Sequence, residues 1–246
     1  VTSIGNEAFC NCSFLRSISI PDMVAWVGDS AFYNCRHLIS ISIPNTLVSI
    51  GNNAFYDCSS LISVDIFGYG KINDFSLSNS PPWGSLKSQI KKIIIQDGLT
   101  SIGSYAFYGF NVMMSINIPK NITYIGSFAF YDCSSLTSII IPNSVTSIGN
   151  SVFYNCSSLS SIDIPNSVTS IGYDTFKYCS SLKSIDVSNS LTKIENSLFC
   201  NCSSLKSINI PNSVTSIGIE VFYNCSSLNS INVPNTVSFI GESAFK

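Results

Sequence analysis

Residues 141–163 read IPNSVTSIGNSVFYNCSSLSSID, residues 164–186 read IPNSVTSIGYDTFKYCSSLKSID, and residues 210–232 read IPNSVTSIGIEVFYNCSSLNSIN. The three stretches share one pattern with a period of 23 residues. A fixed period between about 20 and 50 residues is typical of a solenoid, in which each repeat forms one coil and buries its apolar side chains against its neighbours. The repeat therefore predicts the fold.

The same pattern runs through the whole chain, and the apolar residue before the recurrent glycine marks each coil. This residue recurs at Ile4, Val27, Ile50, Ile102, Ile125, Ile148, Ile171, Ile194, Ile217 and Ile240. Because a longer solenoid gains coils rather than cores, we expect residues 1–246 to form a single domain of about ten and a half coils.

One step in this series is longer than the others. Ile50 and Ile102 are 52 residues apart, which is two periods plus six residues. Ile93 lies in the phase of a further strand inside this step. We therefore expect one insertion, between about Phe67 and Gln89.

Each coil carries two short extended patches. The first is L-x-S-I-x-I-P, as in Leu136–Pro142, and its apolar residues alternate with the period of two that a strand buried on one face requires. The second is V-T-S-I-G, as in Val145–Gly149, where glycine permits a backbone conformation that a side chain would penalise. Glu195 replaces that glycine in one coil, which argues against a strict need for positive φ. We expect a mainly β, right-handed curved solenoid with one parallel sheet of about ten strands and little α-helix.

The L-x-x-I-x-I core, together with proline, V-x-x-I-G, A-F and cysteine at fixed spacing, resembles the BspA-like, or treponemal-type, leucine-rich repeat. The resemblance covers essentially the whole chain, and residues 68–98 are similar to an excursion in that family. Departures from the pattern are local, at Phe110, Lys177 and Ser188. The resemblance implies a parallel sheet on the concave face of a leucine-rich repeat solenoid. It also implies a cell-surface or secreted protein that adheres to proteins of a host or a neighbouring cell.

The composition excludes some partners. Only 11% of the residues are charged and the net charge is −2, so no basic stripe is present to contact nucleic-acid phosphates. The longest apolar run, around residues 93–95, is too short to span a bilayer. The chain starts and stops in mid-coil, without the polar caps that solenoids need. We therefore expect a slice of a longer protein, with end-to-end self-association as a second kind of contact.

Eight of the ten cysteines recur at one position of the coil, which predicts a single file of stacked, buried thiols rather than disulfides. They are Cys12, Cys35, Cys58, Cys133, Cys156, Cys179, Cys202 and Cys225. Zinc needs about four ligands arranged tetrahedrally, which a row of thiols pointing one way does not provide. Cys10 and Cys200 lie in the phase of a tyrosine instead, and we expect them to be the more exposed pair.

No catalytic constellation is apparent, so we expect no enzyme and no cofactor. His37 is the only histidine and lies at a turn that is Ser-Ser in other coils, which predicts a solvent-exposed substitution. Cysteine nucleophiles need a polarising partner, and the file of thiols has none. Asp163 and Asp186 share a strand face with nearby lysines, which is typical of a solvated face.

The outward positions of the strands form columns, one of which is serine throughout. Another column varies, and Ile39, Ile62 and Met114 form an apolar patch in its N-terminal half. Two interpretations remain. Serine lets strands pack and stay hydrated, so that the columns are structural, or the face binds a partner, as solenoid surfaces often do.

The insertion is the second candidate site. It carries Tyr69 and Trp83, with Lys91 and Lys92 close by, and long loops in compact repeats are often functional. Trp83 is either an interface anchor or a packing residue that covers the coil edge where the repeat is interrupted.

Two classes of function remain: a protein-binding or adhesive module at the cell surface or outside the cell, and a structural spacer or surface-layer element without a specific ligand. A glycan-binding module is a weaker third, because the outward columns contain almost no aromatic residues. Of the glycosylation sequons, four have cysteine in the middle. Asn121, with Ile122 in the middle, is the one that we expect to be most readily modified.

Overall fold

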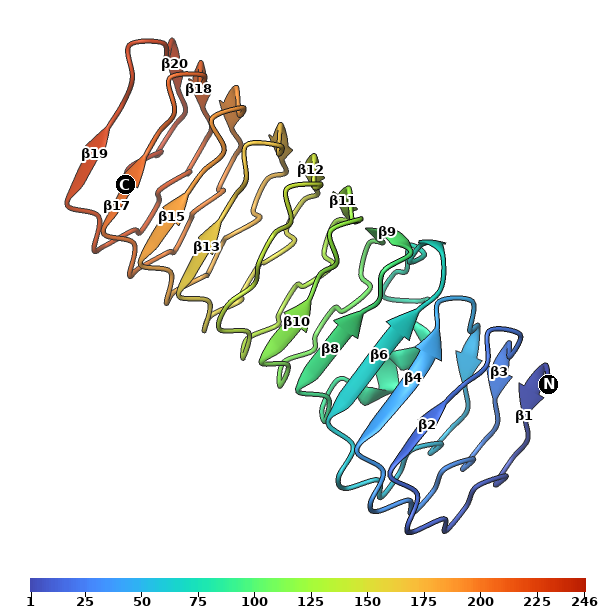
Figure 1. Cartoon of the computed structure of the whole chain (residues 1–246). Helices are drawn as coiled ribbons and strands as arrows, with labels where there is room; N and C mark the ends of the chain where they lie inside the picture. Colours follow the sequence, from blue (N-terminus) through green and yellow to red (C-terminus); the bar gives the residue numbers. More distant parts are fainter.

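The computed structural model describes all 246 residues. Successive coils stack along one axis, with the two termini at opposite ends (Figure 1). Every paired strand is parallel to its neighbour, and most pairs join residues 23 apart, as in Ser3 with Trp26. The solenoid of 23-residue coils predicted from the repeat is thus confirmed.

The first face consists of the L-x-S-I-x-I segments. Most inward isoleucines of this face are buried, Ile18, Ile116 and Ile231 are half-buried, and the outward residues are exposed or half-buried, which is the pattern of a sheet packed on one side. Its strands are β2 (Ser17–Ser19), β4 (Ser40–Pro44), β6 (Ser63–Phe67), β8 (Lys92–Ile95), β10 (Ser115–Asn117), β13 (Ser161–Asp163), β15 (Ser184–Asp186), β17 (Ser207–Asn209) and β19 (Ser230–Asn232).

The predicted strand inside the long step is β8. Its Ile93 pairs with Val64 of β6 and with Ile116 of β10, so the first face continues across the insertion. Residues 138–140, in the same phase, have no strand assigned, and the first face is interrupted there.

A second face is built from the V-T-S-I-G segments, so the expectation of one sheet was wrong. Most apolar residues of the V-T-S-I-G segments are buried, while the residues between them face outward. The short segments pair from coil to coil. Its strands are β1 (Ser3–Ile4), β3 (Trp26–Val27), β5 (Ser49–Ile50), β7 (Gly70–Lys71), β9 (Leu99–Ile102), β11 (Tyr124–Ile125), β12 (Ser147–Ile148), β14 (Ser170–Ile171), β16 (Lys193–Ile194), β18 (Ser216–Ile217) and β20 (Phe239–Ile240).

The core between the two faces is a single cluster of 67 buried apolar residues. Its central feature is a file of phenylalanines, one per coil. The rings of Phe130 and Phe153 lie 5.6 Å apart with planes 5° from parallel, and the same stack repeats from Phe107 to Phe245. Offset stacked rings add to the stability that burial of each ring provides.

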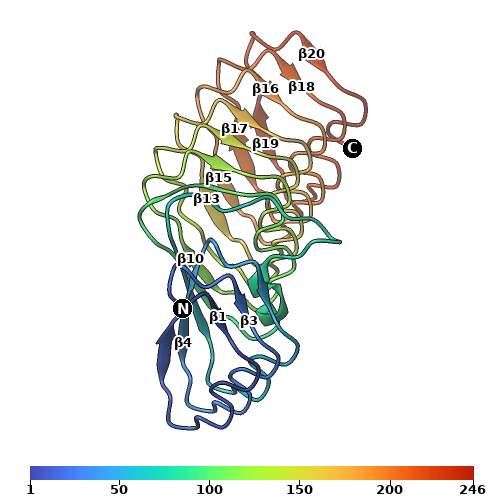
Figure 2. The ribbon, with the colours of Figure 1, turned by 90° about the vertical axis from the view of Figure 1, so that its right-hand side faces the viewer.

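Trp83 takes the place of the missing phenylalanine in the interrupted coil. It lies on η1 (Pro82–Leu86), a 3-10 helix on one side of the stack (Figures 1 and 2). Its indole stacks on Phe107 and its side chain is 1% exposed. The indole Nε1 donates to the buried carbonyl of Ala106 at 2.8 Å. In other coils the equivalent carbonyl accepts from the backbone amide of a phenylalanine, as the Ala129 carbonyl does from Phe107. Trp83 is therefore a packing residue, and its assignment to an exposed binding surface was wrong.

The recurrent glycine is needed because neighbouring coils approach closely at this position. A Cβ added to Gly149 would lie 2.6 Å from the backbone nitrogen of Ser127, which real Cβ atoms essentially never tolerate. Gly149 does not have a positive φ. The reason for glycine in most coils is thus the short distance between coils, and the absence of a strict need for positive φ agrees with Glu195 at this position of one coil.

Seven of the eight in-phase cysteines form the buried file that the sequence predicted. Each thiol donates to the carbonyl of the phenylalanine 26 residues earlier, as Cys156 does to Phe130 at 3.3 Å. Cys12, in the first coil of the structure, is exposed instead. Cys200 is 2% exposed, so the expectation that it would be accessible was wrong, whereas Cys10 is half-buried.

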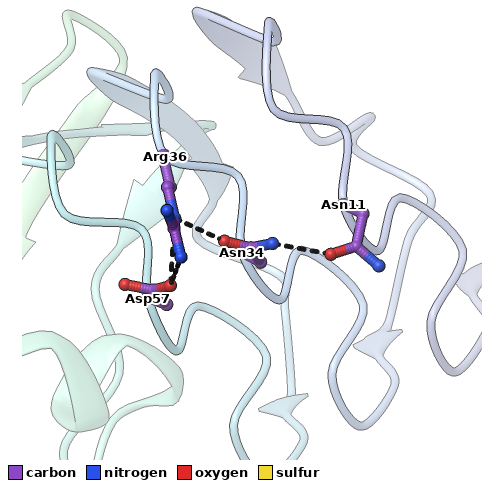
Figure 3. Close-up of polar contacts among 4 residues, drawn as sticks. All are labelled: Asn11, Asn34, Arg36 and Asp57. Carbon is purple, nitrogen blue, oxygen red and sulfur yellow. Dashed lines mark hydrogen bonds and ion pairs between the residues drawn. The ribbon is translucent and has the colours of Figure 1, made fainter.

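A ladder of asparagine and aspartate lies directly before the in-phase cysteines, except before Cys179, where Tyr178 takes this position. These residues have φ between 56° and 63°, a region that Asn and Asp occupy more readily than other side chains. Asn34 Nδ2 donates to Asn11 Oδ1 at 2.7 Å, and Arg36 bonds both Asn34 and Asp57 (Figure 3). The turn side chains are therefore tied from one coil to the next.

Replacing Trp83 tests its structural role. Trp83→Phe leaves the Ala106 carbonyl buried without a donor and should lower the free energy of unfolding by about 1–3 kcal/mol. Trp83→Ala also leaves a cavity, and should cost about 3–5 kcal/mol. Chemical denaturation would measure both, with Trp26→Phe at an exposed site as a control that stays within about 0.5 kcal/mol of the parent. An unchanged denaturation midpoint for Trp83→Ala would contradict this role.

The thiols should differ in reactivity with a thiol reagent under native conditions. Cys12 should react first and Cys10 second, while the buried file and Cys200 stay unreacted. Burial raises the pKa of Cys58 to about 11 and the pKa of Cys179 to about 12, and the thiolate is the reactive form. Mass mapping would give the order, and Cys12→Ser should remove the fastest phase. Modification of Cys156 as fast as Cys12 would refute the burial of the file.

Secretion from a eukaryotic host tests the sequons. Asn121 is exposed and its side chain makes no hydrogen bond within the chain, whereas Asn155 Nδ2 donates to Asp132 at 2.7 Å and Asn224 Nδ2 to Asn201 at 2.8 Å. We expect the highest glycan occupancy at Asn121, measured by peptide mapping. Higher occupancy at Asn155 or Asn201 would contradict the expectation.

Candidate binding surface

The variable column of the first face is continuous from Arg16 to Met114. Consecutive backbone hydrogen bonds join the residues that lie just before successive strands, with donor–acceptor distances of 2.8–3.1 Å. This row, here called the N-terminal patch, consists of Arg16, Ile39, Ile62, Lys91 and Met114. The structure therefore brings together four of the predicted site residues, and it places Lys91 between Ile62 and Met114.

The patch combines exposed apolar groups with positive charge. Ile39, Ile62 and Met114 are 47%, 43% and 53% exposed, so each leaves about half of its apolar surface in water. Lys92 follows Lys91 and pairs in register with Ser63 and Ser115, where it interrupts the column of serines. Lys91 and Lys92 thus add two cations beside an apolar row.

Asp65 is the acidic group closest in the fold to these lysines. It lies on β6, opposite Ile94 of β8. Burial raises the pKa of Asp65 above its ordinary value, and the charge of Lys92 partly offsets that rise. The carboxylate is half-buried, so the outward charge of this end of the face is positive.

Sequence reasoning missed Phe14, which is 88% exposed. Its ring stacks on His37 with centroids 5.9 Å apart, and His37 Nδ1 lies 2.6 Å from the Ser13 carbonyl. Phe14 and His37 each precede a member of the patch by two residues. The available signal was the turn that reads Ser-Ser in most coils, because a phenylalanine there has no buried role. His37 is exposed, as predicted.

Tyr69 does not join the patch. It is 85% exposed but follows the carboxyl end of β6, whereas Ile62 precedes the amino end of the same strand. Since each strand residue advances about 3.3 Å, the strand separates the two side chains. Trp83 is buried in the core, as described above. The candidate residues from the sequence therefore lie in three places: the N-terminal patch with the adjacent Lys92, the carboxyl end of β6, and the core.

The side of the stack between the two faces carries a second aromatic feature, a ladder of half-buried tyrosines. Tyr108 stacks on Tyr131 at 5.0 Å, and Tyr131 on Tyr154 at 4.5 Å. Burial and the neighbouring phenols raise the pKa of Tyr131. Each ring face is covered by the next ring. The ladder therefore offers hydroxyl edges rather than the open ring faces on which a sugar would stack.

The structure contains no group of three or more His, Cys, Asp and Glu side chains placed to hold a metal ion. None of its helices has the length and apolar character that crossing a membrane requires. The chemistry that the N-terminal patch offers is non-covalent contact.

Solved structures with a similar fold are leucine-rich repeat proteins. One from Bacteroides ovatus is 27% identical, with a TM-score of 0.57 over 100% of this chain and 80% of its own. A leucine-rich repeat protein of T. pallidum is 23% identical, with a TM-score of 0.52 over 88% of this chain and 79% of its own. One from Eubacterium ventriosum is 19% identical, with a TM-score of 0.51 over 94% and 88%. The latter two, below 25% identity, show likeness of fold alone.

Among curated proteins, no relative of the chain was found. The model of the BspA type leucine-rich repeat region matches six copies, over residues 1–87, 85–205 and 123–246. These ranges span the whole chain, with the repeat, the parallel strands and the phenylalanine file in agreement. The chain belongs to the BspA-type leucine-rich repeat family.

Proposed function

We propose that the chain is a non-enzymatic protein-binding module of a cell-surface or secreted protein, and that the N-terminal patch is its contact surface. The observation that carries the proposal is that Ile39, Ile62 and Met114 are half-exposed in one row, just before β4, β6 and β10, with Lys91 between the last two. In the C-terminal half the same column holds Ser160, Lys183 and Lys206 instead. Apolar groups that the repeat itself does not require are typical of an interface.

The partner's chemistry follows from the same residues. The patch combines apolar side chains with cations, as protein interfaces do, and Lys91 lies within the apolar row. Arg16, Lys91 and Lys92 favour an acidic rim on the partner, since opposite charges steer association. A partner on a host or neighbouring cell agrees with what the family resemblance implies. The exposed Phe14–His37 pair extends the surface at the N-terminal end.

The competing role is a spacer or surface-layer element, in which the outward columns serve only packing and hydration. A spacer does not need large apolar groups at one end of a column that is otherwise polar. A glycan-binding module receives less support, because the stacked tyrosines cover one another's ring faces.

The test exchanges the patch for the residue that the column holds in another coil. Ile39→Ser, Ile62→Ser and Met114→Ser together should weaken binding to a partner captured by the parent chain by at least about tenfold, because hot spots each contribute about 2 kcal/mol or more. The three side chains are half-exposed, so thermal unfolding should change little. Surface plasmon resonance would give the affinity.

A matched control changes the same column at the other end of the face. Lys183→Ser and Lys206→Ser should leave the affinity within about threefold. Equal loss in both variants would show that the patch is not the interface. No saturable partner for the parent chain would favour the spacer role.

A further inference from the structure

Backbone hydrogen bonds at alternate residues join each coil to the next along the side between the two faces. Three amides of one coil donate to three carbonyls of the following coil. In one coil, at 2.9, 3.0 and 2.8 Å, the donors and acceptors are Phe128 to Asn150, Phe130 to Val152, and Asp132 to Tyr154. The same three bonds recur in eight coils, from the coil of Phe9 to the coil of Phe222.

The coil of residues 50–58 is the exception. The amides of Asn53, Phe55 and Asp57 occupy the same positions as the donors of the other coils, and none has an acceptor within the chain. The insertion is the reason, because it replaces the second-face segment of the next coil. β5 accordingly pairs with β3 alone.

The insertion forms such hydrogen bonds only with the coil that follows it. The Phe75 amide donates to the Ser104 carbonyl at 2.8 Å, and Trp83 Nε1 donates to the Ala106 carbonyl at 2.8 Å. Two of the three acceptors of the following coil are therefore used, while the Tyr108 carbonyl receives no donor. The donors of the preceding coil stay open, in a row with a spacing of two residues.

A cleft lies beside two of these donors, Asn53 and Phe55, and ends just before Asp57. It has a volume of about 360 Å³ and lies between residues 50–56 and four residues of the insertion region, Ser85, Leu86, Ser88 and Gln89. Gln89 Nε2 is buried and has no hydrogen-bond partner. Buried donors without partners are rare in proteins because each costs about 1–3 kcal/mol. One wall of the cleft thus contains backbone amides without acceptors, and Phe55 and Leu86 are among the apolar residues that line it.

We propose that this cleft binds an extended peptide segment of a partner protein, which adds to the coil of residues 50–58 as a following coil would. Three carbonyls at alternate residues of the segment accept from the amides of Asn53, Phe55 and Asp57. This is strand addition to an open edge, in which main-chain hydrogen bonds give affinity and side-chain pockets give specificity.

The repeat defines what such a segment must contain. In all but one of the other coils the segment that accepts these bonds starts with glycine, because a Cβ at that point meets the backbone of the preceding coil, as at Gly149; Glu195 is the exception. The Ile50 carbonyl and the Asn52 side-chain oxygen receive no donor within the chain, so they can accept from amides of the segment. In other coils the Gly149 amide donates to the Ile125 carbonyl in the same way, and the Asn52 amide donates to Asp29 Oδ1. An apolar side chain of the segment packs between Phe55 and Leu86.

The probe is a synthetic peptide of residues 147–155, Ser-Ile-Gly-Asn-Ser-Val-Phe-Tyr-Asn, which carries three such carbonyls. Amide hydrogen exchange of the full chain is followed by NMR. In the free protein the amides of Asn53, Phe55 and Asp57 should exchange at least about tenfold faster than their paired counterparts. Saturating peptide should slow these three at least tenfold, and a scrambled peptide should not.

A paired substitution locates the site. Ser88→Trp fills the cleft from an exposed position and should weaken peptide binding at least tenfold. Ser78→Trp, exposed in the same insertion but outside the cleft, should leave the affinity within about twofold. Equal affinities for the two variants, no binding at millimolar peptide, or binding without protection of the three amides would overturn the proposal. Protection that rises with protein concentration alone would overturn it too, since a second copy would then occupy the cleft.

Discussion

The structure depends on one constraint, the close approach of the backbones of consecutive coils. Neighbouring coils hydrogen-bond to each other on both faces and along the side between them, so each residue must repeat almost the same conformation 23 residues later. Glycine beside the second face follows from this distance, as the contact of Gly149 with the Ser127 backbone illustrates. The stacked phenylalanines follow from it too, and so do the thiols that donate to the phenylalanine carbonyl 26 residues earlier, since like side chains then lie directly above one another.

The insertion shows how the chain accommodates a break in that constraint. On the first face β8 simply continues the sheet between β6 and β10. In the core a larger aromatic ring replaces the phenylalanine, and its indole N–H replaces a backbone donor. The side of the coil of residues 50–58 receives no such replacement. The insertion therefore restores the aromatic packing of the core, but it leaves backbone amides of the coil of residues 50–58 without acceptors.

Function in such a molecule is carried by positions that the repeat does not constrain. The N-terminal patch and the open edge beside the insertion differ in kind. The patch offers apolar side chains and cations on a sheet face, which suits the surface of a folded partner. The open edge offers main-chain donors in a cleft, which suits an extended segment. Both lie in the N-terminal half, where the sequence departs most from its own pattern.

The sequence by itself determined the coil length, the parallel strands, the missing strand β8 and the location of the insertion, because a 23-residue period leaves few ways to bury its apolar residues. It also identified Ile39, Ile62 and Met114, whose exposure follows from strand alternation. It did not determine that Trp83 is buried or Cys200 covered, since both depend on which side chains fill the space beside an irregular coil. Nor did it show that Lys91 joins the patch while Tyr69 lies beyond the other end of β6. Only the tertiary structure decided those points, because the path of the excursion is fixed by contacts between coils and not by local pattern.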